Sequence, residues 1–589
     1  MKTGLQTLNS KESAEVREAI RKLALLNALN YDGKARTQTV LGKLLAERPD
    51  LKTMIKEVAS LVDDVIEEVN RLSMDEQRAI VKTNWPETLD KEKVEEKRAL
   101  PPLPNVRKYE RVVTRFAPNP DCLLHLGSAR AIILCYEYAK MYDGLFYLRF
   151  EDTDPRLKKS ALQFYDLIRE DISWLQCKWD AEFIQSDRIP LYYEYAEEIL
   201  KDGNAYICTC KRQEFAKSVA QKQPCPDRDL TPKENLTRWE HMLDGTYDVG
   251  DAVVRIKTSL DHPNPAVRDW PALRIIDTKK HSHPRVGSKY RVWPLYNFAC
   301  GVDDHLLGVT HIIRGKEHIT NQTRQEYMYR HFGWEYPEAI HYGRLKITGA
   351  FLSKSKILQG LKNGMFKGWD DPRLATFAAL RRRGITPKAI KHMIIAIGPK
   401  PVDVVLSWEN LYAYNRKLID HAADRYFFVH DPVELQVAAI PDRFVARLRL
   451  HPDDPERGFR CVETVPEDGS ASFLISSDDV GILKSRRNIR LMGLFNIGIT
   501  EVEGKTVGAT FLSEAYEEAR KIGAPLIHWI PSETGIPCEV VMPDASVAAG
   551  MAEDSCKTLN PGAIVQFERF GFVRVDQIDR KLVTYFAHR

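Results

Sequence analysis

The chain has 589 residues, of which 43% are hydrophobic, so it can bury several cores and we expect roughly three to five domains. Its 86 basic residues are nearly balanced by 82 acidic ones, which permits nucleic-acid binding without arguing for it. The ten cysteines show no disulfide-like framework, and we find neither a signal peptide nor a long uncharged apolar run. These features exclude a secreted or membrane-spanning class and predict a cytoplasmic protein.

Residues 1–104 are expected to form an N-terminal helical domain and a linker. Apolar residues recur every three or four positions in Ala14–Leu26, Val40–Ala46 and Met54–Leu72. Pro101-Pro102-Leu103-Pro104 is typical of a stiff linker. No residue of this region suggests catalysis, and its default interpretation is a small helical domain or a docking surface for a protein partner.

The next stretch predicts a βαβ unit. Val112–Phe116 is a β-branched run typical of a buried strand, and the prolines that follow it force a turn. An apolar-periodic helix follows to about Tyr142, and Leu145–Phe150 is a second strand. Glu151-Asp152-Thr153-Asp154 comes directly after that strand. Ligands of parallel sheets bind at the carboxyl ends of the strands, so this edge is the candidate site.

The start of the predicted helix carries anion-binding chemistry. A helix that begins at Gly127, between His125 and Ser128, offers unpaired backbone N–H groups and two side-chain donors to an anion. Gly127 would also let a flat group approach the backbone. A single H-x-G-S tetrapeptide is more often a plain helix entry, but Arg115 and the acidic cluster are expected at the same edge and favour a binding site.

A second cluster of ligand-type residues lies further along the chain. Cys208, Cys210, Cys225 and Asp227 have the residue types and spacing of a structural Zn²⁺ site, although a doubled C-x-x-C would be stronger evidence. Three ordinary cysteines in a loop-rich insertion remain the alternative.

Two later features fit an anionic ligand. Ile312-Ile313 is a short strand that ends at Arg314, after the aromatic stretch Lys289–Phe298. Phe351–Lys356 is a basic loop with small hydroxyl residues, which can fold over phosphates but is more often a solvated turn.

Helices and then β-strands are expected after this loop. Pro372–Arg383 and Pro387–Ile397 have helical patterns. From about Tyr426, β-like runs alternate with turn residues, which favours β-barrels. These runs are Arg443–Leu450, Ala471–Ile475, Asn488–Ile497, Pro525–Trp529, Pro537–Met542 and Ala563–Val575. Arg486, Arg487 and Arg490 in this region are plausible phosphate contacts.

The combination of motifs resembles a known family. The HLGS tetrapeptide (His125–Ser128) and LSKSK (Leu352–Lys356) are similar to the two signature motifs of class I aminoacyl-tRNA synthetases. RFAPNP, LRFEDTDP and the segment Tyr290–His318 resemble the glutamyl/glutaminyl branch and, within it, archaeal-type glutamyl-tRNA synthetases. The resemblance covers about Pro104 to Arg589. It implies a multidomain α/β-plus-β protein with a Rossmann-type catalytic core.

The resemblance also implies a domain order. It predicts the first Rossmann half at 105–200, an acceptor-binding insertion at 201–295, the second half at 296–345, a helical connector with a KMSKS-like loop at 346–425, and anticodon-binding β-barrels at 426–589.

Site residues follow position by position from the same resemblance. The ATP-binding positions are Pro118, Asn119, His125, Gly127, Ser128 and Lys354, of which His125, Ser128 and Lys354 are the catalytic ones. The glutamate-binding positions are Arg115, Asn119, Glu151, Tyr296, Cys300 and Arg314. Arg314 matches the residue that pairs with the side-chain carboxylate, and Lys354 matches the one that stabilises the departing pyrophosphate.

Three departures from the family pattern stand out. Ser128 replaces the usual final His of the first signature, and Phe351-Leu352 replace Lys-Met in the second. Cys122 replaces a common glycine, and we have no physical account of that change. Because a hydroxyl can still donate to a phosphate oxygen and Lys354 is retained, we expect a retuned and active site.

The implied activity is that of a glutamate–tRNA ligase that uses ATP with Mg²⁺, L-glutamate and tRNA(Glu). Whether tRNA(Gln) is also charged is open, and a monomer is expected. The alternatives are a glutaminyl-tRNA synthetase, against which Arg314 argues, and a non-catalytic tRNA-binding paralogue, against which the joint retention of His125, Lys354, Glu151 and Arg314 argues.

Overall fold

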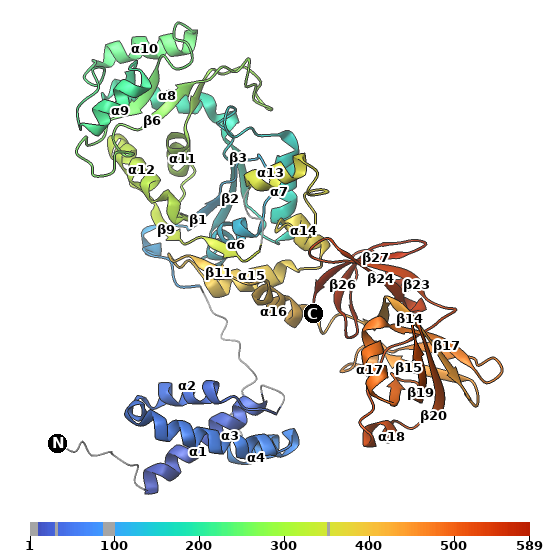
Figure 1. Ribbon diagram of the computed structural model, residues 1–589. Helices are drawn as coiled ribbons and strands as arrows, with labels where there is room; N and C mark the ends of the chain where they lie inside the picture. Colours follow the sequence, from blue (N-terminus) through green and yellow to red (C-terminus); the bar gives the residue numbers. More distant parts are fainter. Residues whose placement is uncertain (1–9, 30–32, 86–99, 350–353) are drawn as a thin grey trace. The chain divides into compact units, whose positions relative to one another are not determined.

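The computed structural model describes residues 10–29, 33–85, 100–349 and 354–589 (Figure 1). The chain divides into two compact units, Met1–Ala99 and Leu100–Arg589. Within the described residues, no helix has both the length and the apolar character that crossing a bilayer requires.

The N-terminal unit is helical, as expected. Its helices are α1 (Ser10–Leu29), α2 (Thr37–Glu47), α3 (Ile55–Arg71) and α4 (Met74–Asn84). Apolar side chains at helical spacing, such as Ile20 of α1 and Val62 of α3, are fully buried in a core of this unit's own. Ser73 and Glu76 form a reciprocal capping box that starts α4.

The first part of the α/β core is a parallel sheet. Its strands are β1 (Val113–Phe116), β2 (Leu145–Phe150) and β3 (Ala181–Ile184), in that order, connected by α6 (Leu126–Met141) and α7 (Leu162–Trp174). The β-branched and aromatic residues of β1 and β2 are largely buried, which explains why these runs form strands. The predicted βαβ unit is therefore confirmed.

The second part continues this core beside β1. The strands β8 (His311–Gly315) and β9 (Glu338–Tyr342) are parallel and are connected by α12 (Ile319–Phe332). The backbone N–H of Thr310 donates to the Val113 carbonyl at 3.0 Å, and the Thr310 hydroxyl accepts from the Val113 N–H at 2.8 Å. These bonds align the carboxyl ends of β1 and β8, and thereby bring Arg115 and Arg314 to one side of the core.

An insertion separates the two parts. It holds an antiparallel sheet of β4 (Ala205–Cys208), β5 (Val253–Ile256), β6 (Pro271–Ile275) and β7 (Val292–Pro294). The helices around it are α8 (Ile189–Lys201), α9 (Arg212–Ala220), α10 (Pro232–Asp244) and α11 (Tyr296–Leu306). Ile189 and Tyr192 of α8 are fully buried in the insertion's core, so its packing begins before residue 201.

Helices connect this core to the C-terminal part. The elements are β10 (Leu345–Ile347), α13 (Lys354–Lys362), α14 (Phe377–Arg382), α15 (Pro387–Ile397), β11 (Val404–Leu406) and α16 (Trp408–Ile419). The predicted helix Pro372–Arg383 is too long at its start. Thr376 is the N-cap, and its hydroxyl accepts the Ala379 N–H at 3.2 Å, so the helix begins at Phe377.

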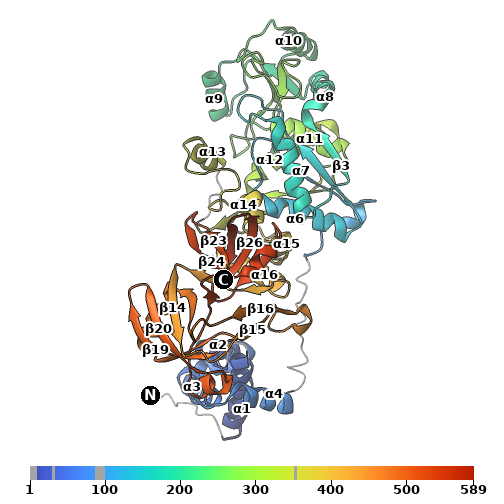
Figure 2. The same cartoon turned by 90° about the vertical axis from the view of Figure 1, so that its right-hand side faces the viewer.

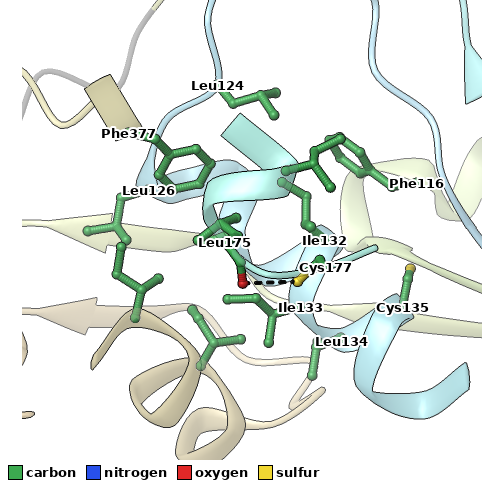
Figure 3. Packing of buried hydrophobic residues seen from close by; sticks show 14 of the residues in the cluster. Phe116, Leu124, Leu126, Ile132, Ile133, Leu134, Cys135, Leu175, Cys177 and Phe377 are labelled. Carbon is green, nitrogen blue, oxygen red and sulfur yellow. Dashed lines mark hydrogen bonds between the residues drawn. The ribbon is translucent and has the colours of Figure 1, made fainter. Parts of the chain in front are cut away.

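Figure 3 shows how the start of α14 packs against the turn that precedes α6. Phe377 packs with Leu124 and Leu126 in the main hydrophobic cluster, next to Ile132 and Ile133 of α6. The Leu126 N–H donates to the Ala375 carbonyl at 2.9 Å, and the Phe377 N–H donates to the Leu124 carbonyl at 3.2 Å. The turn that carries His125 is therefore attached to the start of α14.

The C-terminal part is β-rich, as predicted. One sheet has the order β12-β25-β26-β27-β23-β24-β13 and the other β21-β18-β19-β20-β14-β17-β22, with β15 and β16 as a separate hairpin. The bounds in the first sheet are β12 Arg425–Tyr426, β13 Phe428–His430, β23 Ile536–Val541, β24 Val547–Ala552, β25 Ile564–Phe567, β26 Gly571–Ile578 and β27 Leu582–His588. Those in the second sheet are β14 Pro432–Ala438, β17 Ala471–Ser476, β18 Asn488–Leu491, β19 Asn496–Glu503, β20 Thr506–Ser513, β21 Leu526–Ile527 and β22 Ile530–Pro531. The hairpin is β15 Phe444–Arg449 with β16 Phe459–Thr464, and the helices are α17 Val480–Ser485 and α18 Tyr516–Lys521.

Two predictions in this region are corrected. Asn488–Ile497 is not one strand, because Gly493 has a φ of 69° and the chain turns there between β18 and β19. Arg490 is no phosphate contact, because it is buried and its guanidinium donates to the Asn496 side chain at 2.9 Å and to the Glu514 carbonyl at 3.0 Å. The next arginines in the prediction, Arg486 and Arg487, are exposed.

Candidate active site

His125 is the N-cap of α6. Its Nδ1 accepts the Gly127 N–H at 3.0 Å, so the neutral ring carries its proton on Nε2 and can donate from there. Burial lowers the pKa of His125, which favours this neutral form.

The role expected for Gly127 needs correction. A Cβ on Gly127 would lie 2.7 Å from Cε1 of His125, so the space beside this glycine belongs to the His125 ring. A glycine is needed here because the His125 ring lies against the backbone of residue 127. The Gly127 N–H is already bound to His125 Nδ1. The side-chain donors at this helix start are therefore the Nε2–H of His125 and the hydroxyl of the half-buried Ser128.

The carboxyl ends of β1 and β2 meet at this edge. The Glu151 N–H donates to the Pro118 carbonyl at 2.9 Å, which closes the turn 117–120 onto the acidic loop. Asn119 and Glu151 line a cavity of about 300 Å³ together with Tyr296, Asn297, Lys158 and Arg324. The buried Oδ1 atoms of Asn119 and Asn297 have no hydrogen-bond partner among the residues that the structure describes, so the cavity offers unused polar groups to a ligand.

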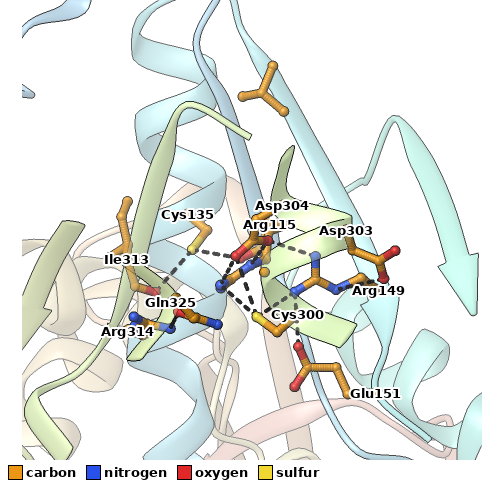
Figure 4. A network of polar contacts seen from close by, with 12 residues as sticks. Arg115, Cys135, Arg149, Glu151, Cys300, Asp303, Asp304, Ile313, Arg314 and Gln325 are labelled. Carbon is orange, nitrogen blue, oxygen red and sulfur yellow. Dashed lines mark hydrogen bonds and ion pairs between the residues drawn. The ribbon is translucent and has the colours of Figure 1, made fainter. Parts of the chain in front are cut away.

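A buried ion-pair network lies next to this cavity (Figure 4). Arg115 of β1 donates from Nε and Nη2 to both oxygens of Asp304, each at 3.0 Å. Arg149 of β2 donates to Asp304 at 2.7 Å and to Glu151 at 2.9 Å. The hydrogen bond from Arg149 thereby fixes the orientation of the Glu151 carboxylate, which lines the cavity.

The charges in this network are balanced. Burial acts to raise the pKa of Asp304, but the guanidinium groups of Arg115 and Arg149 outweigh it and hold the pKa below its usual range. Burial raises the pKa of Cys300 to about 12, so the thiol is neutral, and it lies 3.1 Å from Nη2 of Arg149. Arg115 and Cys300 are therefore part of a preformed framework.

Arg314 differs from these arginines. Its Nη1 donates to Oε1 of Gln325 at 3.1 Å and its Nη2 to the Tyr336 hydroxyl at 2.9 Å. The buried Nε has no hydrogen-bond partner in the part of the chain that the structure describes. Among the described residues, no carboxylate forms an ion pair with Arg314, although only 5% of its surface is exposed. A buried, uncompensated guanidinium is costly, so this group indicates a site for a ligand carboxylate.

Tyr296 links these groups to the cavity. It is the first residue of α11 and lies in the cavity wall. Burial, together with the nearby Cys300 and Glu151, raises its pKa, whereas Arg314 and Arg115 act to lower it. The structure thus brings together Arg115, Asn119, Glu151, Tyr296, Cys300 and Arg314, the six positions predicted for glutamate.

The predicted second signature is only partly described. Phe351, Leu352 and Ser353 lie outside the described residues. Lys354 is the first residue of α13, and its side chain is not described. The predicted contact of Lys354 with ATP therefore stays a prediction.

The predicted zinc ligands lie together. One ligand atom from each of Cys208, Cys210, Cys225 and Asp227 lies within 4.8 Å of all the others. The Sγ atoms of Cys208 and Cys210 are 3.5 and 3.0 Å from that of Cys225. The hydrogen bond with Cys225 lowers the pKa of Cys208. Asp227 also accepts from the Thr209 N–H at 2.7 Å and pairs with Arg238 at 2.8 Å.

Sequence reasoning missed Arg149, Asp304, Gln325 and Tyr336. A signal existed for the first two, because Arg149 lies in the apolar run of β2 and the acidic pair Asp303-Asp304 lies on the mostly apolar helix α11. Charged residues in such places are buried with partners. Nothing in the pattern around Gln325 or Tyr336 distinguishes them from ordinary core residues.

The fold and the site together define a class I aminoacyl-tRNA synthetase: a split parallel core, an H-x-G-S helix start at its carboxyl edge, and β-rich sheets after a helical connector. Comparison with known families agrees. Residues 111–421 match "tRNA synthetases class I (E and Q), catalytic domain", and residues 423–513 and 526–576 match the two anti-codon binding domains of the same enzymes. The chain belongs to the family of class I tRNA synthetases for glutamate and glutamine.

Individual relatives are similar over the full length. A glutamate–tRNA ligase of Pyrococcus furiosus is 51% identical over 582 residues, which cover 98% of this chain and 100% of that protein. A glutamate–tRNA ligase of Methanopyrus kandleri is 45% identical, covering 96% of this chain and 98% of that protein. A solved glutamate tRNA ligase of Elizabethkingia meningosepticum is 22% identical with a TM-score of 0.41, covering 53% of this chain and 71% of that one.

Proposed function

We propose that this chain is a glutamate–tRNA ligase, which activates L-glutamate with ATP and transfers the glutamyl group to the terminal adenosine of tRNA(Glu). The observation that carries the proposal is the Arg314 guanidinium, which is buried beside Tyr296 and which, among the described residues, is hydrogen-bonded only to neutral groups. A side-chain carboxylate satisfies that charge, whereas the amide of glutamine would leave it uncompensated. The relatives named above carry the same activity in their names.

The first step needs no general base. The glutamate α-carboxylate is ionised at neutral pH and attacks the α-phosphorus of ATP, which forms the adenylate and releases pyrophosphate with Mg²⁺. Catalysis then consists of positioning and of stabilising negative charge. His125, through its Nε2–H, and Ser128 donate to the phosphates, Pro118, Asn119 and Gly127 shape the nucleotide side, and Lys354 stabilises the departing pyrophosphate.

The amino acid is held from the other side. Glu151, oriented by Arg149, receives the ammonium group, and Asn119 and Tyr296 bind the polar groups next to it. Arg115 and Cys300 act through the framework around Asp304. In the second step a ribose hydroxyl of the tRNA attacks the activated carbonyl carbon and AMP leaves.

We also propose that the thiol cluster holds a structural Zn²⁺. Three sulfurs and one carboxylate oxygen at mutual distances up to 4.8 Å fit a closed tetrahedral site. The ion would brace the insertion, which we assign to the acceptor end of the tRNA, and would take no part in the reaction.

The remaining assignments are coarser. The β-rich sheets bind the anticodon region, as their family models state. We propose a cytoplasmic monomer whose N-terminal helical unit docks a protein partner.

The deciding experiment is aminoacylation with glutamate and with glutamine, each against tRNA(Glu) and tRNA(Gln). We expect glutamate alone to be attached to tRNA(Glu), and glutamate attached to tRNA(Gln) would show a non-discriminating enzyme. Attachment of glutamine alone would favour the glutaminyl alternative. No attachment of either, with retained tRNA binding, would favour a non-catalytic paralogue.

A further inference from the structure

Three side chains form a closed hydrogen-bonded ring behind the proposed glutamate pocket. Arg314 of β8 donates to Gln325 of α12 and to Tyr336, which precedes β9. The Tyr336 hydroxyl in turn donates to Oε1 of Gln325 at 2.9 Å. The ring therefore has a defined direction: the Gln325 oxygen accepts twice, and the tyrosine accepts once and donates once.

The Gln325 amide is fixed in its orientation. The side chain is fully buried, and its Nε2 lies 3.4 Å from the Asn297 carbonyl, which it faces as a donor. Its Oε1 faces two donors, so the swapped orientation would place an NH₂ group against Arg314 and the Tyr336 hydroxyl. Figure 4 shows Gln325 directly beside the Arg314 guanidinium.

Every group that holds Arg314 is electrically neutral. Burial raises the pKa of Tyr336 well above physiological pH, and Gln325 does not ionise. By contrast, the other two buried arginines of the site, Arg115 and Arg149, share the carboxylate of Asp304. The protein thus neutralises two of these guanidinium groups and orients the third without neutralising it.

We propose that Gln325 and Tyr336 are positioning residues that determine specificity: they aim Arg314 at the substrate's side-chain carboxylate while leaving its positive charge uncompensated. The inference rests on the proposed function and adds to it the reason why the acceptor at position 325 is an amide. A glutamate at 325 has the same shape, but it would form an internal ion pair with Arg314 and compete with the substrate.

The test is Gln325→Glu, with binding measured by titration calorimetry. The probes are the two non-reactive adenylates made from L-glutamol and L-glutaminol, which present a carboxylate and an amide side chain to the same pocket. We expect the variant to lose about 100-fold in affinity for the glutamol adenylate and to keep its affinity for the glutaminol adenylate within about threefold, because only the former needs the free charge.

Two further variants make the result interpretable. Gln322→Glu places the same charge change on α12 at a half-buried position, where the amide donates to Glu326 at 2.8 Å, and it should leave both affinities unchanged. Tyr336→Phe removes one hydrogen bond to Arg314 without adding charge, and it should weaken the glutamol adenylate about tenfold.

The outcomes separate the inference from the proposed function. Equal losses for both adenylates in Gln325→Glu would reduce Gln325 to a structural residue and overturn the inference, as would no loss for either. A wild-type protein that binds the glutaminol adenylate as tightly as the glutamol adenylate would instead refute the glutamate assignment itself. If Gln325→Glu does not fold, the loss confined to the glutamol adenylate in Tyr336→Phe supports the inference, and equal losses there overturn it.

Discussion

The Arg382 guanidinium on α14 pairs with the Asp576 carboxylate on β26, with Nε–Oδ1 and Nη2–Oδ2 distances of 3.3 and 2.9 Å. Figure 2 shows α14 close to β26. The neighbouring Arg383 is buried and donates to the Ala587 carbonyl of β27 at 3.0 Å. Thr376, the N-cap of α14, pairs with His125 in an isolated β-bridge, so one short helix contacts both the β-rich sheet and the turn that carries His125.

This contact predicts a measurable coupling. Arg382→Ala and Asp576→Ala both remove this ion pair, which corresponds to about 0.5–1 kcal/mol. Arg382→Ala also removes the pair with Asp370 at 2.8 Å, so it should lower the melting temperature more than Asp576→Ala does. The double variant should lose less stability than the sum of the two single losses, because the shared ion pair is lost only once. Additive shifts in a double-mutant cycle of thermal melts would show that the two residues do not interact.

Removal of the Arg314 side chain should weaken the use of glutamate without changing the use of ATP. Arg314→Ala is expected to reduce kcat/KM for glutamate by about 2–4 kcal/mol in transition-state free energy, because a buried partner of the substrate carboxylate is lost. The KM for ATP should stay unchanged, since the residue lies among amino-acid-binding positions. Steady-state aminoacylation measures both, and wild-type kinetics with glutamate would remove Arg314 from the pocket.

Lys354 is expected to serve the departing pyrophosphate. Lys354→Ala should slow ATP–pyrophosphate exchange, measured in the presence of tRNA, by orders of magnitude, because a charge that stabilises the transition state is lost. Its tRNA affinity, followed by filter binding, should hardly change. Exchange at the wild-type rate would contradict the assigned role.

The zinc proposal predicts both a metal content and a stability effect. Metal analysis should find about one Zn²⁺ per chain, and Cys225→Ser should lose it. Prolonged chelation should lower the melting temperature, because the ion contributes to folding of the insertion. Cys461→Ser serves as the control, since Cys461 is an exposed cysteine outside the cluster. A metal-free protein with an unchanged melting temperature under chelation would refute the site.

Asp171 on α7 predicts a pH dependence of stability. Burial raises its pKa to about 7, which the Arg381 guanidinium at 3.5 Å only partly offsets. The folded state therefore binds a proton that the unfolded state releases above about pH 4, so the Asp171 contribution to stability falls as the pH rises from about 4 to about 7 and is constant above.

Asp171→Asn should remove this part of the pH dependence. The Leu124 N–H, 3.3 Å from an Asp171 oxygen, can still find an acceptor in the amide. We expect the melting temperature of the variant relative to wild type to be higher at pH 8 than at pH 5. A difference that does not change between these two pH values would show that Asp171 does not titrate in this range.

The sequence was sufficient for elements with a strong local signal. The strand Leu145–Phe150 and the helix Pro387–Ile397 were predicted with their observed bounds, because a short apolar and aromatic run defines the first and a Thr-Pro helix start defines the second. The start of α14 could not be predicted, since Thr376 becomes a cap only where the segment is held against Leu124 and Leu126.

The same limit applies to the site. The resemblance supplied the residues that face the ligand, because they lie within motifs. The partners that orient them come from distant segments: Asp304 lies 189 positions from Arg115, and Tyr336 lies 22 positions from Arg314. Such pairings depend on how α11 and α12 pack on the strands, and one sequence does not determine that packing.

Described residues anchor the chain on both sides of the second signature. Before it, Leu345 of β10 pairs with Val404, and after it, the Ala375 carbonyl receives the Leu126 N–H. Among the described residues, hydrogen bonds attach the turn that carries His125 only to the second of these anchors. The sequence between them can therefore depart from the family pattern, as it does at Phe351-Leu352, without moving the His125 half of the proposed nucleotide site.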